Sequence, residues 1–217
     1  MNKTLWEEKK QYKFNGNRLT SVNEIAPGVV VYEDVIPNSS NLYLDIEEGM
    51  TSCGLKWGIA GVYENNNAGI NPESRDTLTI GVPYSREKSN DYSHPRAAFY
   101  STLNNIFIEN FNAYEDDYKH SYQVTTNWHD MWGILKYEVG NKFVNHIDDG
   151  VHAHRRISMI YYLNDNYSGG EITFPRFDIT IKPKANQMII FPSTYVYNHS
   201  VSPVTEGTRY SVVSWLK

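Results

Sequence analysis

The alternation of apolar and polar residues is most regular in the C-terminal part of the chain. From Ile134 onward, short runs of β-branched and aromatic residues are separated by Gly, Pro, Asn and Asp. Such runs are typical of short strands, whose successive side chains point to opposite faces. Eight short strands favour a double-stranded β-helix, the jelly roll of cupin-like barrels. We predict them at residues 134–139, 143–148, 154–164, 170–174, 178–181, 187–191, 195–201 and 208–216.

Two segments of the N-terminal half predict helices beside this β core. Pro95 suits a first helical position, and the Asn38-Ser39-Ser40 cluster suits the start of a second helix that stops near Gly49. We expect the first helix to end before a polar connection at residues 112–126. The fold class is therefore mainly β with flanking helices. Apolar residues with a helical period follow Pro95 at Phe99, Leu103, Ile106, Phe107, Phe111 and Tyr114.

The rest of the N-terminal half predicts strands at residues 28–32 and 55–63, followed by polar segments. The region from Glu64 to Ser93 is rich in Asn, Ser and charged residues and is interpreted either as solvated loops or as a mobile lid. We expect one domain over residues 1–217. Residues 1–130 would supply supporting helices, strands and the lid, and residues 131–217 the jelly-roll core with the chemistry.

Composition and charge exclude several classes of protein. The net charge of −5 lacks the basic footprint of a nucleic-acid binder. No run of 18 apolar residues occurs, and residues 1–13 lack the apolar core of a signal peptide. Cys53 is the only cysteine, so neither an intramolecular disulfide nor a cysteine metal site can form. We expect a soluble cytoplasmic protein without nucleic-acid or membrane partners.

A candidate metal site is formed by His146, Asp148 and His199. His146 and Asp148 lie two apart in an expected strand, which places both side chains on one face and Ile147 on the other. His199 follows within the aromatic run at 195–201. Two imidazoles and one carboxylate leave open positions on an octahedral ion, as in non-haem Fe(II) oxygenases. Because such a triad also occurs by chance, the surrounding residues decide its meaning.

Arg209 is near the start of the last predicted strand, and its position argues against a chance occurrence of the triad. The period of two places it on one face with Ser211, Val213 and Trp215. A cation among apolar strand residues is costly to bury without an anionic partner. A dicarboxylic co-substrate would provide that partner.

From Ile134 to the C-terminus the chain resembles the 2-oxoglutarate and Fe(II)-dependent dioxygenases, in their prolyl 4-hydroxylase-like branch. Residues before about 130 carry no comparable motif. The turn at Asn186 departs from the family, where Gly is usual. The residues that carry the resemblance are Tyr137, His146-Ile147-Asp148, Arg155, Tyr161-Tyr162-Leu163-Asn164, Gly169-Gly170-Glu171, Pro183-Lys184, Phe191-Pro192-Ser193, His199-Ser200-Val201, Arg209 and Trp215.

The resemblance implies the cofactors Fe(II), 2-oxoglutarate as co-substrate and O2, with ascorbate as a further candidate. It implies no catalytic residue beyond the metal ligands. It assigns roles by position in this sequence: His146, Asp148 and His199 would bind Fe(II), and Arg209, Tyr162 and Tyr137 would hold 2-oxoglutarate.

The resemblance also implies a reaction, in which 2-oxoglutarate and O2 give succinate and CO2 while an unactivated C–H bond is hydroxylated. Its substrate would be a prolyl residue of a peptide or protein, contacted by Arg155, Trp215 and Phe143. Phe143 stands where the family usually has Tyr, which weakens the assignment of prolyl peptides.

Two alternatives to a prolyl substrate remain open. A hydroxylase of a free amino acid or other small molecule would need fixed charges in the lid, such as Arg75 or Lys88. A noncatalytic jelly-roll module would keep only the metal. Two further histidines near the triad, His152 and His154, follow the Asp149-Gly150 turn and are interpreted as turn residues rather than ligands.

Overall fold

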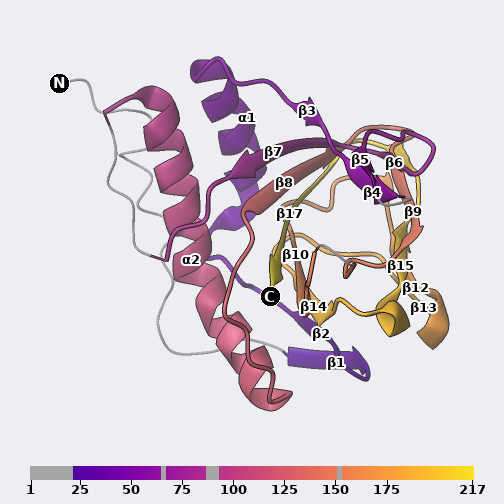
Figure 1. The fold of residues 1–217 in the computed structure, drawn as a ribbon. Helices are drawn as coiled ribbons and strands as arrows, with labels where there is room; N and C mark the ends of the chain where they lie inside the picture. Colours follow the sequence, from indigo (N-terminus) through magenta and orange to yellow (C-terminus); the bar gives the residue numbers. More distant parts are fainter. Residues whose placement is uncertain (1–21, 65–66, 87–92, 151–152) are drawn as a thin grey trace.

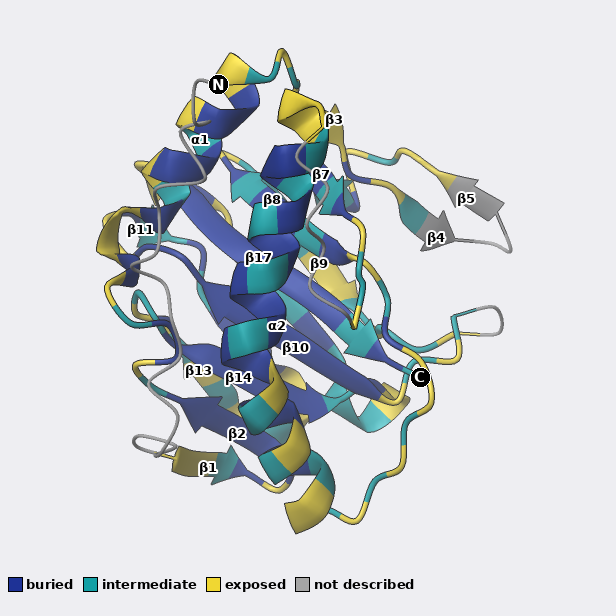
Figure 2. Ribbon diagram, turned by 90° about the vertical axis from the view of Figure 1, so that its left-hand side faces the viewer, coloured by how far each residue is buried: buried dark blue, intermediate teal, exposed yellow. Residues whose placement is uncertain are grey.

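The computed structural model describes residues 22–64, 67–86, 93–150 and 153–217. Its core is a pair of sheets packed face to face, with two helices on the outer face of the larger sheet (Figures 1 and 2). Each strand pairs antiparallel with its neighbours in these sheets. This arrangement is the predicted β fold with flanking helices, and the prediction of the fold class is confirmed.

The larger sheet has eight strands and the smaller one five, and both take strands from both halves of the chain. In spatial order the larger sheet contains β1 (Val22–Ala26), β2 (Val29–Tyr32), β14 (Met188–Pro192), β10 (Ile157–Tyr162), β17 (Arg209–Leu216), β8 (Trp132–Tyr137), β7 (Leu78–Val82) and β3 (Gly58–Ile59). The smaller sheet contains β13 (Ile179–Ile181), β12 (Ile172–Phe174), β15 (His199–Val201), β9 (Lys142–His146) and β6 (Arg75–Asp76). Two short ribbons pair β4 (Val62–Glu64) with β5 (Asn67–Gly69) and β11 (Ser168–Gly169) with β16 (Val204–Glu206).

Strand β10 lies between two hydrophobic cores. All six of its residues are buried. Met159 and Tyr161 belong to the cluster beneath the helices, and Ile160 and Tyr162 to the cluster between the sheets. The alternation follows from the period of two in a strand. It explains why this segment is a continuous apolar run in sequence, and it directs Tyr162 into the inter-sheet space.

Helix α2 (Pro95–Ser121) crosses the outer face of the larger sheet (Figure 2). Its first turn is capped by the ring of His94, which accepts a hydrogen bond from Arg96 N at 3.2 Å. Helix α1 (Leu42–Ser52) adds a second cover and ends slightly later than the predicted stop near Gly49. Together they bury the helix-facing side of the sheet.

The prediction of a polar connection at residues 112–126 was wrong, because α2 continues to Ser121. Asn112, Asp116 and His120 of this part are exposed, whereas Tyr114 and Tyr118 are buried together with Glu115. The Tyr118 hydroxyl donates a hydrogen bond to Gly28 O at 2.8 Å. Burial of these two Tyr side chains on one face thus explains why the helix continues through a polar segment.

Several predicted strands are shorter than expected, among them 154–164, of which Ile157–Tyr162 form β10, and 170–174, of which Ile172–Phe174 form β12. Residues 195–197 form a 3-10 turn, η3 (Tyr195–Tyr197), and the strand begins only at His199. The Tyr197 hydroxyl donates to Pro27 O at 2.9 Å, which holds this turn against β1 and β2. Strand β9 ends at His146, so Asp148 lies in the following bend. The strand predicted at 55–63 is divided between β3 and β4.

The predicted loop region from Glu64 to Ser93 contains regular structure where it is described. β7 is paired on both edges, with β8 and β3, and β6 joins the smaller sheet beside β9. Part of this region is therefore a fixed piece of the scaffold. Two further 3-10 turns complete the described elements, η1 (Ser39–Asn41) and η2 (Pro175–Phe177).

No helix within the described ranges combines the length and the apolar character that crossing a membrane requires.

The Gly169-Gly170 turn yields a test of packing. Both residues have positive φ, as the sequence suggested, and a Cβ on Gly170 would lie 2.9 Å from Arg209 Cδ. We expect Gly170→Ala to cost the left-handed penalty of roughly 1–2 kcal/mol plus an overpacking cost of about 1–3 kcal/mol. Thermal and denaturant unfolding would measure both.

Gly140→Ala is the matched control for this variant. Gly140 has a φ of +91°, and a Cβ added to it would meet no atom of the described residues within 4 Å. It should therefore lose only the conformational part. Equal destabilisation of the two variants would show that the contact with Arg209 contributes nothing.

Candidate metal centre

The structure brings His146, Asp148 and His199 together at the ends of two neighbouring strands. β9 and β15 pair antiparallel with His146 opposite His199, so the two imidazoles are cross-strand neighbours. Asp148 Oδ1 lies 3.5 Å from His146 Nε2, and Asp148 Oδ2 lies 3.8 Å from His199 Nε2. One ligand atom of each residue falls within 4.8 Å of the others. Asp148 lies in the bend after β9 rather than in the predicted strand, and it still lies close to both imidazoles.

Backbone carbonyls orient both imidazoles. Val144 O lies 2.8 Å from Nδ1 of His146, and Tyr197 O lies 3.1 Å from Nδ1 of His199. Because a carbonyl only accepts, Nδ1 carries the proton in each ring, and the lone pair of Nε2 points toward Asp148. The ring of Phe143 also stacks on His146 at 3.5 Å between centroids. Both rings are therefore held in the tautomer that metal ligation requires.

Asp148 is held in its ionised form. Burial raises its pKa, but the imidazoles of His199 and His146 and the Ser158 hydroxyl outweigh burial and hold the pKa well below its usual range. Ser158 Oγ donates to Asp148 Oδ2 at 2.6 Å and contacts Ser193 Oγ at 2.8 Å. The site therefore contains a buried carboxylate with a fixed orientation.

His199 is neutral in its buried position. Burial and repulsion from His146 lower the pKa of His199 to about 4, against the opposite effects of Asp148 and the Tyr197 carbonyl. Two imidazole nitrogens and one carboxylate match the ligand preference of divalent non-haem iron. A cation would also balance the buried negative charge. The donor chemistry and the burial thus fit a bound metal.

Arg209 lies at the start of β17 with its guanidinium in the same inter-sheet space. It is only 1% exposed, and its Cζ lies 4.7 Å from the ring centroid of Tyr137 and 5.0 Å from that of Tyr162. Tyr137 is its partner across the β17–β8 pairing. The one side-chain hydrogen bond found for its guanidinium within the described residues goes to Ser211 Oγ at 3.4 Å.

Several buried polar atoms around Arg209 have no hydrogen-bond partner among the described residues. They are Nε of Arg209 and the hydroxyls of Tyr162 and Tyr167. Burying such groups unpaired is costly. Their convergence therefore indicates a site for an anionic acceptor, as the sequence argument for Arg209 required. Tyr167 was missed in the sequence, where it follows two Asn and an Asp in a segment that resembles a polar turn.

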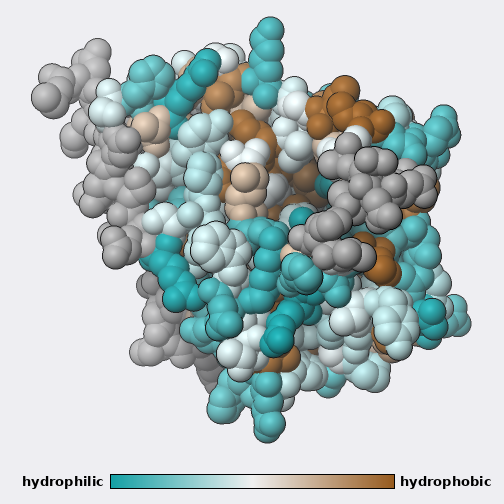
Figure 3. All heavy atoms as spheres, in the orientation of Figure 1, coloured by the Kyte–Doolittle hydropathy of each residue, from teal (hydrophilic) through white to brown (hydrophobic). Residues whose placement is uncertain are grey.

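One pocket connects the triad with Arg209. The predicted face of β17 is confirmed, because Arg209, Ser211, Val213 and Trp215 all line it. The face seen in Figure 3 is mostly hydrophilic, with hydrophobic residues mainly in its upper part. The remaining lining residues are Arg75, Leu135, Tyr137, Phe143, His146, Asp148, Ile160, His199 and Val201.

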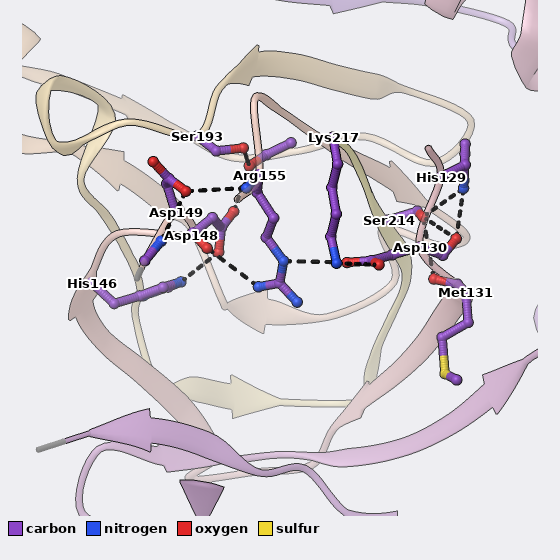
Figure 4. A network of polar contacts seen from close by, with 12 residues as sticks. His129, Asp130, Met131, His146, Asp148, Asp149, Arg155, Ser193, Ser214 and Lys217 are labelled. Carbon is purple, nitrogen blue, oxygen red and sulfur yellow. Dashed lines mark hydrogen bonds and ion pairs between the residues drawn. The ribbon is translucent and has the colours of Figure 1, made fainter. Parts of the chain in front are cut away.

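Arg155 joins the triad to a polar network (Figure 4). Its Nη1 donates to Asp148 O at 3.3 Å, and its Nε donates to Asp130 Oδ2 at 3.4 Å. The guanidinium carbon lies 3.4 Å from the ring centroid of Trp215. Asp130 is shared with Lys217, whose Nζ lies 2.8 Å away. Two of the predicted substrate residues, Arg155 and Trp215, thus form one stacked wall beside the metal site.

Other candidate residues fall into three groups. Arg75, named in the sequence only as a lid charge, lines the pocket. His154 is exposed and outside the triad. His152 and Lys88 lie outside the described residues.

The C-terminal part of the chain is similar in sequence to known proteins. Residues 132–217 match the family model described as the 2OG-Fe(II) oxygenase superfamily. A PKHD-type hydroxylase of Synechococcus sp. (strain CC9902) is 33% identical over 90 residues, which cover 39% of this chain and 40% of that protein. Prolyl 3-hydroxylase 2 of Homo sapiens is 39% identical over 66 residues, covering 28% of this chain and 9% of that protein. The chain therefore aligns with less than half the length of these relatives.

Solved structures share the fold over most of the chain. A prolyl-4-hydroxylase of Pseudomonas putida has a TM-score of 0.60 at 15% identity, covering 88% of this chain and 92% of that one. A prolyl hydroxylase of Trichoplax adhaerens, solved with a peptide fragment of hypoxia inducible factor, has a TM-score of 0.61 at 17% identity and covers 87% and 83%. At these identities the likeness concerns the fold.

Removing a ligand should abolish metal binding. We expect Asp148→Ala and His199→Ala to lose Co(II) or Fe(II) binding at stoichiometric concentration, because two remaining donors hold a divalent ion weakly. Anaerobic calorimetry and the Co(II) absorption spectrum would measure this. His154→Asn is the control, since His154 is exposed with a φ of +50° that Asn tolerates. Unchanged metal affinity in both ligand variants would contradict the site.

Proposed function

We propose that the chain is a 2-oxoglutarate- and Fe(II)-dependent dioxygenase, because its residues 132–217 match the model of the 2OG-Fe(II) oxygenase superfamily. The reaction is the hydroxylation of an unactivated C–H bond, with a prolyl residue of a peptide or protein as the substrate. The observation that carries the proposal is one pocket that holds both a buried His-Asp-His triad and a buried guanidinium without an anion among the described residues.

The residues of the pocket would have the following roles in this reaction. His146, Asp148 and His199 hold Fe(II), which with 2-oxoglutarate and O2 supplies the oxidising chemistry that yields succinate and CO2. Ser158 keeps the Asp148 carboxylate in one orientation through its 2.6 Å hydrogen bond. The inter-sheet aromatic and aliphatic residues exclude water from this space. No other side chain is assigned a catalytic role.

Arg209 and Tyr162 would bind the distal carboxylate of 2-oxoglutarate. The Nε–H of Arg209 and the hydroxyl of Tyr162, for which the described residues provide no acceptor, supply donors for a charge-assisted contact. Tyr137 contributes the face of its ring to Arg209 and closes the pocket from β8. Tyr167 is a further donor whose hydroxyl has no partner among the described residues. The pocket thus satisfies its buried polar groups when a dicarboxylate is present.

The assignment of a prolyl substrate is supported by the named relatives, which include prolyl hydroxylases. In this chain Arg155 lies over the ring of Trp215, and Phe143 adds an aromatic ring that stacks on His146. A pyrrolidine ring could lie against such surfaces. Ascorbate as an additional cofactor and a cytoplasmic location stay predictions from the sequence.

A free amino acid or another small molecule is the second candidate substrate. The observation that favours it is Arg75, a cation that lines the pocket from β6. A noncatalytic jelly-roll module would bind metal without turnover. Succinate release from 2-oxoglutarate, compared between proline-rich peptides, free proline and no substrate, separates these three functions.

Arg209 is the most specific test of the co-substrate. A hydrogen bond to a charged group contributes about 1.5–3 kcal/mol, so Arg209→Ala should weaken 2-oxoglutarate binding roughly tenfold to a hundredfold. Arg209→Lys should recover part of the loss, because the charge returns without the planar fork. Titration of the anaerobic Fe(II) complex with 2-oxoglutarate measures the affinities.

Metal affinity is the internal control of that titration, and it should stay unchanged because Arg209 is not a ligand. A folded Arg209→Ala protein that binds 2-oxoglutarate as tightly as wild type would sink the co-substrate assignment. The triad would then belong to a metal site of another class.

The lid prediction for residues 64–93 becomes more specific with the structure. β7 is paired on both edges, so its amides should be protected from hydrogen exchange with and without substrate. The described residues of the β4–β5 ribbon and residues 70–73 should gain protection only when a turnover-competent substrate binds. Full protection of the ribbon in both states would show that it is a fixed part of the scaffold.

A further inference from the structure

We infer that the substrate presents a carboxylate group to Arg75, at the entrance of the metal pocket. This inference rests on the proposed function and refines it, because it names a chemical feature that the hydroxylated molecule must carry. The anion would come either from the α-carboxylate of a free amino acid or from an acidic side chain of a peptide.

Arg75 is placed by pairing between the two halves of the chain. β6 adds to the edge of the smaller sheet beside β9, with Arg75 directly opposite Phe143. Its guanidinium carbon lies 4.7 Å from the centroid of the Phe143 ring. Phe143 in turn stacks on the ligand His146 at 3.5 Å. The positive charge is therefore one aromatic ring away from a metal ligand.

The guanidinium of Arg75 is incompletely satisfied. Its Nη1 donates to Gly61 O at 3.1 Å, while Nε is buried and has no hydrogen-bond partner among the described residues. Within the part of the chain that the structure describes, none of the ion pairs found involves Arg75. A buried donor of a charged group without an acceptor is costly. A substrate carboxylate that reaches the pocket would remove that cost.

The other charges at the entrance do not offset Arg75. Asp130, the carboxylate beside Arg155, already serves both Arg155 and Lys217. Asp148 is turned to the imidazoles and to Ser158. Under the proposed function Arg209 is matched by the distal carboxylate of 2-oxoglutarate. Among the described residues, Arg75 is then the pocket-lining cation for which the protein and the co-substrate provide no anion.

A purely structural role for Arg75 explains only part of these contacts. Stacking on Phe143 and the bond to Gly61 would hold β6 against β9, and an uncharged side chain of similar length could supply much of the stacking. It would not require Nε to stay buried and unpaired. The unpaired donor in the pocket wall is the feature that points to a ligand.

The test measures substrate binding to the anaerobic Fe(II) and 2-oxoglutarate complex by calorimetry. One pair of probes is L-proline and L-prolinamide, and the other is the blocked tripeptide Ala-Pro-Glu and its Gln counterpart. Each pair differs by one carboxylate. Arg75→Gln removes the charge, and Arg176→Gln is the control because Arg176 is exposed and lies 5.9 Å from the ring centroid of Tyr195, outside the pocket lining.

In at least one pair, the carboxylate member should bind wild type and Arg176→Gln about tenfold more tightly than its neutral counterpart, as expected for one charge-assisted hydrogen bond. This preference should fall below about threefold in Arg75→Gln, with the affinity for 2-oxoglutarate unchanged. The pair that shows the preference identifies the source of the carboxylate.

Four results would overturn the inference: equal binding within both pairs, no binding of any probe, a preference that survives in Arg75→Gln, or a loss of 2-oxoglutarate affinity in that variant. The last would assign Arg75 to the co-substrate. The proposed function is judged separately, by whether wild type binds Fe(II) and 2-oxoglutarate and releases succinate. Those readouts can succeed while the carboxylate preference is absent.

Discussion

The antiparallel pairing of β9 with β15 is the constraint on which the chemistry of this molecule depends. It places His146 opposite His199, although the two residues are 53 positions apart in the sequence. Asp148 lies in the bend that follows β9 and accepts a hydrogen bond from Ser158. The carbonyls of Val144 and Tyr197 that fix the ring tautomers belong to the same two chain segments. A shift of one residue in this register would turn one imidazole away from the site. The register is therefore also the determinant of the ligand geometry.

Around this pairing the fold separates two buried charges of opposite sign. Asp148 accepts a hydrogen bond from Ser158 and faces the two imidazoles, whereas Arg209 is surrounded by aromatic rings and by Ser211. Both line one pocket, yet neither satisfies the other. Arg209 is thus a buried cation that depends on a ligand to offset its desolvation, whereas the carboxylate is already held in place by its neighbours. Such a pocket is adapted to bind a divalent cation at one end and an anion at the other.

Much of this could be predicted from the sequence, and the failures have physical causes. The strands around the triad and the face of β17 follow from a period of two, which is local information. The extension of α2 to Ser121 was missed, although Tyr114 fits the helical period, because Tyr118 is embedded in a polar segment and its hydroxyl bonds to the distant Gly28 carbonyl. The η3 turn was hidden by aromatic residues that normally favour strands.

The side chains that sequence reasoning missed or left undecided share one property. Tyr167, Asp130 and Arg75 act through contacts that cross the chain, and none lies within a motif. Their local sequence is that of a polar turn or a loop. A role that arises from tertiary contacts leaves no periodic trace, so only the assembled sheets could show it.

The helix on the outer face is also connected to the site by direct contacts. Glu115 of α2 lies 3.1 Å from His129 Nε2, and both side chains are buried. The neighbouring residue, Asp130, holds Arg155 against Trp215 and beside the carbonyl of Asp148 (Figure 4). A continuous set of polar contacts therefore runs from the helix cover to the wall of the metal pocket. Because these contacts are partly or fully buried, the position of α2 on the sheet helps to define the position of the pocket wall, and α2 contributes to the geometry of the site as well as to the core.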